Sequence, residues 1–130
     1  MSFESLPIGM TKRATAEVTL DAAPNQISNS LMPIMWPSRI GVTGQKTEEN
    51  PLKITVYGEH SMSFRSWGEI VKIEITNYGN GSKVEAESKA RISTTIFDYG
   101  QNKENLQVLL NQLILKFRLT SQLAIEEKTF

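Results

Sequence analysis

The sequence of 130 residues contains no cysteine, a single histidine and no long apolar run. Without cysteine the chain can form no disulfide, no thiol nucleophile and no thiolate metal site, and cysteine usage gives no hint of a redox compartment. No segment approaches the roughly 18 apolar residues of a membrane-spanning helix. Residues 1–7 have neither the basic region nor the apolar stretch of a signal peptide. The sequence therefore predicts no membrane span and, by default, a cytoplasmic location.

Neither sign of charge dominates, because 14 basic residues balance 14 acidic ones. A nucleic-acid-binding protein normally carries a basic surface, so no nucleic-acid partner is expected. The length suits one domain spanning residues 1–130. We expect its core to lie within about 12–119, with loosely ordered ends at 1–11 and 120–130.

Four segments alternate between apolar and polar residues, which is typical of strands with one buried and one exposed face. In the segment of residues 82–92 one face has small and apolar side chains, while the other face is fully charged. One further strand is expected in the middle of the chain, which brings the antiparallel sheet to about five strands. Gly58 is expected to end the second segment. The four segments are residues 12–20, 52–57, 69–76 and 82–92.

The cluster Asn77-Tyr-Gly-Asn-Gly81 predicts a tight hairpin turn between the last two strands. A tip at Tyr78-Gly79 would place unlike charges opposite one another, with Glu74 facing Lys83. A tip at Asn80-Gly81 uses the best hairpin dipeptide but places like charges opposite one another. The sequence leaves both registers open.

Two helices are predicted. Pro24 suits the first position of a short helix that runs to about Leu31 or Met32, because Pro33 and Pro37 oppose its continuation. A longer helix is expected from about Gly100 to Arg118, with Asp98 near its start as a cap. Its apolar stripe has helical spacing and comprises Leu106, Leu109, Leu110, Leu113, Ile114 and Phe117.

Val108, Leu115 and Leu119 widen this apolar arc, which indicates either deep burial or a second partner for the flank of the helix. Taken together, the elements predict an α+β fold of order β-α-β-β-β-β-α. In this fold an antiparallel sheet packs against the long C-terminal helix.

Two stretches carry a resemblance to known families. The segment Ala14-Thr-Ala-Glu-Val-Thr-Leu-Asp-Ala-Ala-Pro24, followed by Ile27 and Leu31, resembles the first strand, turn and helix of the START-like helix-grip superfamily, which includes polyketide cyclases and lipid-transfer domains. The stretch from Trp67-Gly-Glu through Phe97-Asp-Tyr-Gly-Gln-Asn102 into the Leu-rich helix is similar to uncharacterised bacterial families of small domains. The chain is short for a full helix-grip domain.

The resemblance implies that a small hydrophobic ligand binds between the sheet and the C-terminal helix. Recognition would be mostly hydrophobic, and no charged residue is expected on the two faces that enclose the ligand. A polar group near an opening, such as Tyr57 or Tyr99, would orient the ligand. The other residues expected to line this space are Val71, Ile73, Ile75, Leu106, Leu110, Leu113, Phe117 and Trp67.

His60 is the obvious candidate for chemistry, since only its unperturbed pKa lies near neutrality. Without cysteine or a second histidine it cannot complete a usual zinc site, and Glu59 would point to the opposite strand face. We therefore expect a surface or turn histidine. The sequence contains no phosphate loop or nucleophile elbow, and it predicts no catalytic residue, metal or cofactor.

The alternative function is that of a protein–protein interaction or regulatory domain with a packed interior and no ligand. Its contact patch would lie around Trp36, around Trp67 or along the outer flank of the last helix, and it would bind a protein partner or a second copy of the chain. A cyclase-like enzyme is disfavoured, because no acid and base can be named.

Overall fold

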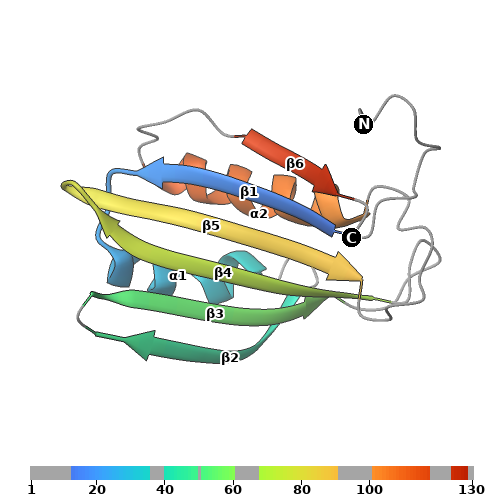
Figure 1. Cartoon of the computed structure of the whole chain (residues 1–130), viewed down its shortest axis with the longest axis horizontal. Helices are drawn as coiled ribbons and strands as arrows, with labels where there is room; N and C mark the ends of the chain where they lie inside the picture. The colour runs from blue at the N-terminus through green and yellow to red at the C-terminus, as the bar shows by residue number, and fades with distance from the viewer. Residues whose placement is uncertain are drawn as a thin grey trace.

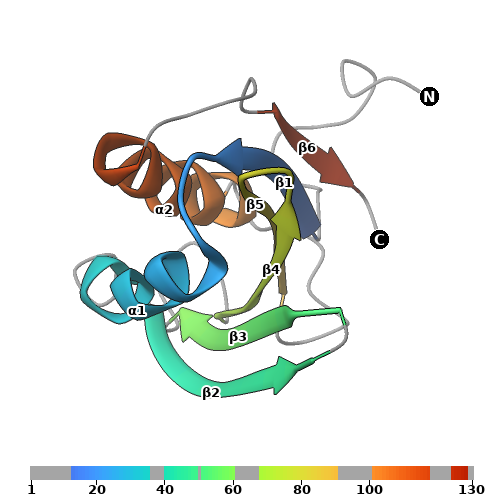
Figure 2. The ribbon, with the colours of Figure 1, turned by 90° about the vertical axis from the view of Figure 1, so that its left-hand side faces the viewer.

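The computed structural model describes residues 13–35, 40–49, 51–60, 68–90, 101–117 and 124–128. It has an α+β fold, as predicted, in which one antiparallel sheet carries two helices on one face (Figures 1 and 2). The sheet has six strands rather than five. In chain order the elements are β1 (Arg13–Leu20), α1 (Pro24–Met35), β2 (Ile40–Glu48), β3 (Lys53–His60), β4 (Glu69–Tyr78), β5 (Gly81–Ala90), α2 (Gln101–Lys116) and β6 (Ala124–Lys128).

The strand order is β2-β3-β4-β5-β1-β6, so β1 is inserted between β5 and β6. The sixth strand, β6, comes from the end segment that was expected to be loosely ordered, and it pairs with β1 from Arg13 to Glu17. Its five residues, Ala-Ile-Glu-Glu-Lys, do not alternate strictly between apolar and polar. The pairing with β1, rather than the local sequence, therefore accounts for this strand.

The two helices lie side by side on the inner face of the sheet (Figure 2). α1 packs against β2, β3 and β4, whereas α2 packs against β1, β5, β6 and α1. Inward side chains of the strands and both helices form one buried apolar cluster. No described element covers the outer face of the sheet.

α1 begins at Pro24 as predicted, and the Ala23 N–H donates to the Gln26 side chain at 3.0 Å, which caps the helix start. The predicted end was wrong, because the helix passes Pro33 and ends at Met35. A proline inside a helix removes one backbone hydrogen bond and costs about 3 kcal/mol or more. Met35 is fully buried in the core, and this burial offsets part of the cost.

β3 runs through Gly58 to His60. The prediction that Gly58 ends this strand was therefore wrong. A Cβ at Gly58 would lie 2.7 Å from Met35 Cε and 2.9 Å from Ile40 Cγ2. The absence of a side chain there lets the end of α1 pack directly on the strand backbone.

The hairpin between β4 and β5 adopts neither of the two registers considered from the sequence. Tyr78 pairs with Gly81, so the tip is Gly79-Asn80, and Gly79 has a φ of 59°. This left-handed conformation is one that glycine adopts readily in tight hairpin turns. As a result Lys72 faces Glu87, but Glu74 faces Glu85.

α2 matches the predicted long helix closely. Leu106, Leu109, Leu110 and Leu113 are fully buried, whereas Val108 and Leu115 are 39% and 80% exposed. The flank of the helix is thus at the surface and does not widen the core. Asp98 and Leu119 lie outside the described residues. Within the described ranges no helix is long and apolar enough to cross a membrane.

Candidate functional site

The structure brings most of the expected ligand-lining residues together between the sheet and the helices. Val71, Ile73 and Ile75 from β4 meet Leu106, Leu110 and Leu113 from α2 in the apolar cluster, and none of the six is exposed. Phe117 is partly buried against the same cluster. Tyr57 is exposed on the outer face, and Trp67 and Tyr99 lie outside the described residues.

A cluster of polar side chains closes one end of this interior. Glu69, the first residue of β4, is completely buried, and His60 Nδ1 lies 2.9 Å from its Oε1. His60 Nδ1 has no hydrogen-bond partner, because the geometry of this contact does not meet the angular requirement of a hydrogen bond. The contact is an ion pair only when the imidazole is protonated. Two predictions were therefore wrong. His60 is buried rather than at the surface, and the inner face does carry a charged residue.

Residues of α2 and β5 complete the polar cluster. The Asn105 side-chain amide donates to Glu69 Oε1 at 2.9 Å and to Ser88 Oγ at 3.1 Å, and the Ser88 hydroxyl donates to Asn102 Oδ1 at 2.8 Å. Ser88, Asn102 and Asn105 are buried as well. These hydrogen bonds link α2 to β4. α2 packs on β5, β1 and β6, whereas β4 packs against α1.

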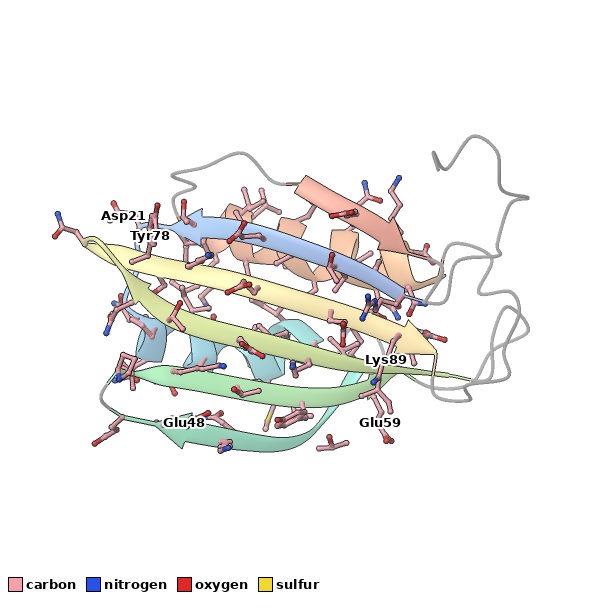
Figure 3. The ribbon with its side chains drawn as sticks, in the orientation of Figure 1. Asp21, Glu48, Glu59, Tyr78 and Lys89 are labelled. Atoms are coloured by element: carbon pink, nitrogen blue, oxygen red, sulfur yellow. The ribbon has the colours of Figure 1, made fainter. Side chains whose placement is uncertain are left out.

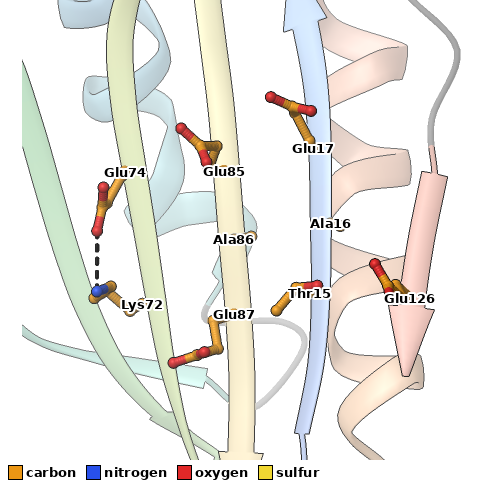
Figure 4. Close-up of a pocket in the computed structure, with 9 residues that line it drawn as sticks. All are labelled: Thr15, Ala16, Glu17, Lys72, Glu74, Glu85, Ala86, Glu87 and Glu126. Atoms are coloured by element: carbon orange, nitrogen blue, oxygen red, sulfur yellow. Dashed lines mark ion pairs between the residues drawn. The ribbon is translucent and has the colours of Figure 1, made fainter. Parts of the chain in front are cut away.

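The opposite face of the sheet carries rows of charges across neighbouring strands. Glu85 in β5 lies directly opposite Glu74 in β4 and directly opposite Glu17 in β1 (Figure 4). The adjacent row holds Lys72, Glu87, Thr15 and Glu126 on β4, β5, β1 and β6.

These two rows line a solvent-open groove of about 400 Å³ on the uncovered face (Figure 4). Five of its nine lining residues are glutamates and one is a lysine. The full lining is Thr15, Ala16, Glu17, Lys72, Glu74, Glu85, Ala86, Glu87 and Glu126. We call this feature the acidic groove.

Lysines around and within the acidic groove neutralise some of its carboxylates. Glu74 Oε1 lies 2.9 Å from Lys72 Nζ and its Oε2 lies 3.0 Å from Lys53 Nζ. The hydrogen bonds from these two ammonium groups hold the pKa of Glu74 below its ordinary value. Lys83 Nζ lies 2.7 Å from Glu17, and the hydrogen bond to that carboxylate raises the pKa of Lys83. Arg13 Nη1 lies 3.5 Å from Glu87.

Glu85 and Glu126 are exposed and have no ion pair with any residue in the described part of the chain. Glu85 is thus flanked by two glutamates on the neighbouring strands, and its electrostatic interaction with Lys83 on the same strand is not an ion pair. Lys89, four residues further along β5, is likewise exposed and without an ion pair there (Figure 3).

Among the described residues no group of three or more acidic or histidine side chains has the arrangement of a metal site. The buried polar cluster contributes no residue to the acidic groove. The groove and the polar cluster are thus separate features on opposite faces of the sheet.

Sequence reasoning missed both sites for different reasons. Glu69 is in phase with the apolar face of β4, so extending the alternation by two residues would have placed it inward. The acidic groove depends on which residues of four strands become neighbours, and a single strand pattern does not contain that information.

No protein-family model matches the chain, and no curated protein is significantly similar to it. The START-like helix-grip resemblance therefore stays a hypothesis.

Proposed function

We propose that this chain is an interaction module that binds a cationic segment of a partner on the uncovered face of its sheet. The observation that carries the proposal is the acidic groove, a hollow of about 400 Å³ with five glutamates on a face that no described element covers. Antiparallel sheets commonly expose one face to water, so exposure alone implies no function. The groove and its charge pattern are the specific features.

The charge pattern lowers the stability of the isolated sheet. Like charges directly opposite one another on neighbouring strands are destabilising, by an amount comparable to the roughly 0.2 to 1 kcal/mol of a favourable pair. Glu85 has such a neighbour on both sides. Sequences break local rules of this kind mainly at functional sites, and a partner's lysine or arginine over Glu85 would remove the repulsion.

The binding would depend on several charges acting together. A single exposed ion pair contributes about 0 to 1 kcal/mol, so one contact at Glu85 is too weak to hold a partner. Glu126 and the partly neutralised Glu87 lie in the neighbouring row of the same groove. We expect fast association that weakens as ionic strength rises.

Nuclear magnetic resonance tests this proposal. A short lysine-rich peptide titrated into the isotope-labelled protein at low salt should shift the amide signals of β4, β5 and β1. Glu85→Lys should weaken the binding. Glu49→Lys, which makes the same charge change at an exposed residue between β2 and β3, should leave it intact. Equal effects of the two substitutions, or shifts confined to other elements, would refute the acidic groove as the binding surface.

A second candidate is a module that binds a small hydrophobic ligand between the sheet and α2, as the START-like resemblance implies. It is favoured by the meeting of the expected lining residues there. The complete burial of six of them in one cluster argues for a filled interior, because native interiors hold few voids larger than a water molecule.

Native mass spectrometry after incubation with a lipid extract distinguishes this candidate. The wild type should retain a ligand, and Leu110→Trp should fill the space and displace it. If the wild type retains nothing and Leu110→Trp is strongly destabilised by overpacking, the interior is already full and this candidate fails.

A further inference from the structure

The tip of the hairpin between β4 and β5 holds an asparagine between two glycines. Asn80 lies between Gly79 and Gly81, and all of its neighbours back to Asn77 are exposed. The Asn80 side chain has no hydrogen bond or ion pair within the described part of the chain. Its carboxamide is therefore free to turn back towards the main chain.

The fold requires a glycine directly after Asn80. A Cβ at Gly81 would overlap the main-chain oxygen of Leu20, at the end of β1. This glycine also has a chemical consequence. Because it carries no side chain, its nitrogen can approach the preceding carboxamide with less hindrance than the nitrogen of any other residue. The packing of β5 against β1 thus places the most reactive possible neighbour next to Asn80.

We propose that Asn80 is a site of spontaneous deamidation. The main-chain nitrogen of Gly81 attacks Cγ of Asn80, and the new N–Cγ bond replaces the Cγ–Nδ2 bond. The proton of the attacking nitrogen leaves with the amide group as ammonia, and a cyclic succinimide remains. Water then opens this ring at either carbonyl, which gives aspartate or isoaspartate. The reaction needs no reactant besides water.

Pairing in the sheet slows this reaction in the folded chain. Tyr78 and Gly81 are partners in the ladder, so the Gly81 nitrogen reaches the carboxamide when the tip opens. Exposed ends of hairpins open at a lower free-energy cost than the interior of a sheet. The glycines on both sides of Asn80 also leave its backbone unusually free. We therefore expect deamidation of the folded protein that is slower than in a free peptide of residues 76–84.

The two products affect the hairpin differently. Aspartate adds a negative charge at the tip and keeps the length of the main chain. Isoaspartate routes the main chain through the former side chain and adds one methylene group between residues 80 and 81. The start of β5 is held in place, because Gly81 lies against Leu20 and the Ser82 hydroxyl donates to the Ala22 oxygen at 2.6 Å. Isoaspartate should therefore break the last pairs of the hairpin.

The acidic groove depends on the same hairpin. Its register places Glu74 opposite Glu85. Fraying that spreads from the tip loosens this register, so isoaspartate at position 80 should weaken binding of the lysine-rich peptide. This consequence rests on the proposed function, whereas the chemistry at Asn80 does not.

Incubation of the full chain in mildly alkaline buffer, followed by digestion and mass spectrometry, tests the proposal. The unmodified peptide that carries Asn80 should be lost in favour of aspartyl and isoaspartyl forms, which chromatography separates. Asn77 and Asn111 are internal controls, because both are exposed but precede residues with large side chains. Asn80→Gln should resist conversion, since its longer side chain closes a larger ring less readily. No loss at Asn80, or equal loss at all three asparagines, overturns the proposal.

Thermal melts test the effect on the hairpin. The purified isoaspartyl form should have a lower melting temperature than the unmodified protein. Asn80→Asp reproduces the aspartyl product and should keep a melting temperature close to that of the unmodified protein. Equal melting temperatures for the isoaspartyl form and Asn80→Asp overturn the inferred disruption of the hairpin. If the lysine-rich peptide binds none of these proteins, the interaction-module proposal fails while the modification site stands.

Discussion

Polar groups are buried and hydrogen-bonded on the inner face of the sheet, whereas they are exposed to solvent on its outer face. On the inner face Glu69 is completely buried, and Asn105 donates a hydrogen bond to it at 2.9 Å. On the outer face Glu85 is exposed to solvent between two other glutamates and has no ion pair in the described structure. The inner face encloses its polar groups within the fold, whereas the outer face leaves Glu85 exposed to solvent. Under the proposed function, stability and recognition depend on different sides of the sheet.

The largest effect is expected in the apolar contact between α2 and the inner face of the sheet. Leu110→Ala and Leu113→Ala should each lower the free energy of unfolding by about 2 to 5 kcal/mol, as truncation of buried leucines does. Lys89→Gln on the outer face should change it by less than about 0.5 kcal/mol. Denaturant melts measure both, and similar effects on the two faces would contradict their assignment.

A smaller effect is expected in the polar cluster. Asn105→Ala removes the donor to Glu69 and Ser88 and leaves buried polar atoms short of a partner, which should cost about 1 to 3 kcal/mol. Asn111→Ala is the matched control, because Asn111 is exposed on the same helix. An equal change in the urea midpoint for both variants would show that the buried network contributes nothing specific.

On the outer face a substitution should raise the free energy of unfolding instead of lowering it. Glu85→Lys replaces two repulsive cross-strand neighbours with two attractive ones, so it should stabilise the monomer by about 0.2 to 1 kcal/mol. Thermal melts of monomeric protein should show the gain at low salt and a smaller gain at high salt. A loss of stability would mean that the acidic row is not repulsive in the folded chain.

The smallest effect is a pH dependence at Glu74. Its pKa is lowered in the folded state by Lys72 and Lys53, so the unfolded chain binds a proton more readily. Its contribution to stability is present at neutral pH and is lost as pH falls through the lowered pKa. Acidification should therefore destabilise the wild type more than Glu74→Gln. Parallel stability curves for the two proteins would exclude this contribution.

Local periodicity explains what the sequence could predict. Strict alternation in β1, β4 and β5 and the leucine stripe of α2 reflect burial that repeats along one element, so these elements appear close to their predicted bounds. The continuation of α1 past Pro33, the continuation of β3 past Gly58 and the existence of β6 depend on packing or pairing with distant residues. No local pattern encodes them.

The acidic groove illustrates the same limit in the candidate site. Its residues come from four strands, and the register of one hairpin decides whether Glu74 faces a lysine or a glutamate. Charge pairing favoured one register and turn composition the other, whereas the structure uses the register between them. A shift of this kind changes the chemistry of the face without changing the pattern of any single strand.

The insertion of β1 between β5 and β6 has a consequence for the order of folding. During synthesis β1 emerges long before either neighbour, so its backbone groups remain unpaired while β2, β3 and β4 can already pair with one another. Pairings between segments distant in sequence form slowly, and an unpaired strand is prone to aggregation in the interval. Pulse-labelling hydrogen exchange during refolding should therefore show protection of β3, β4 and β5 before protection of β1. Simultaneous protection of all four strands would indicate that the sheet forms in one step.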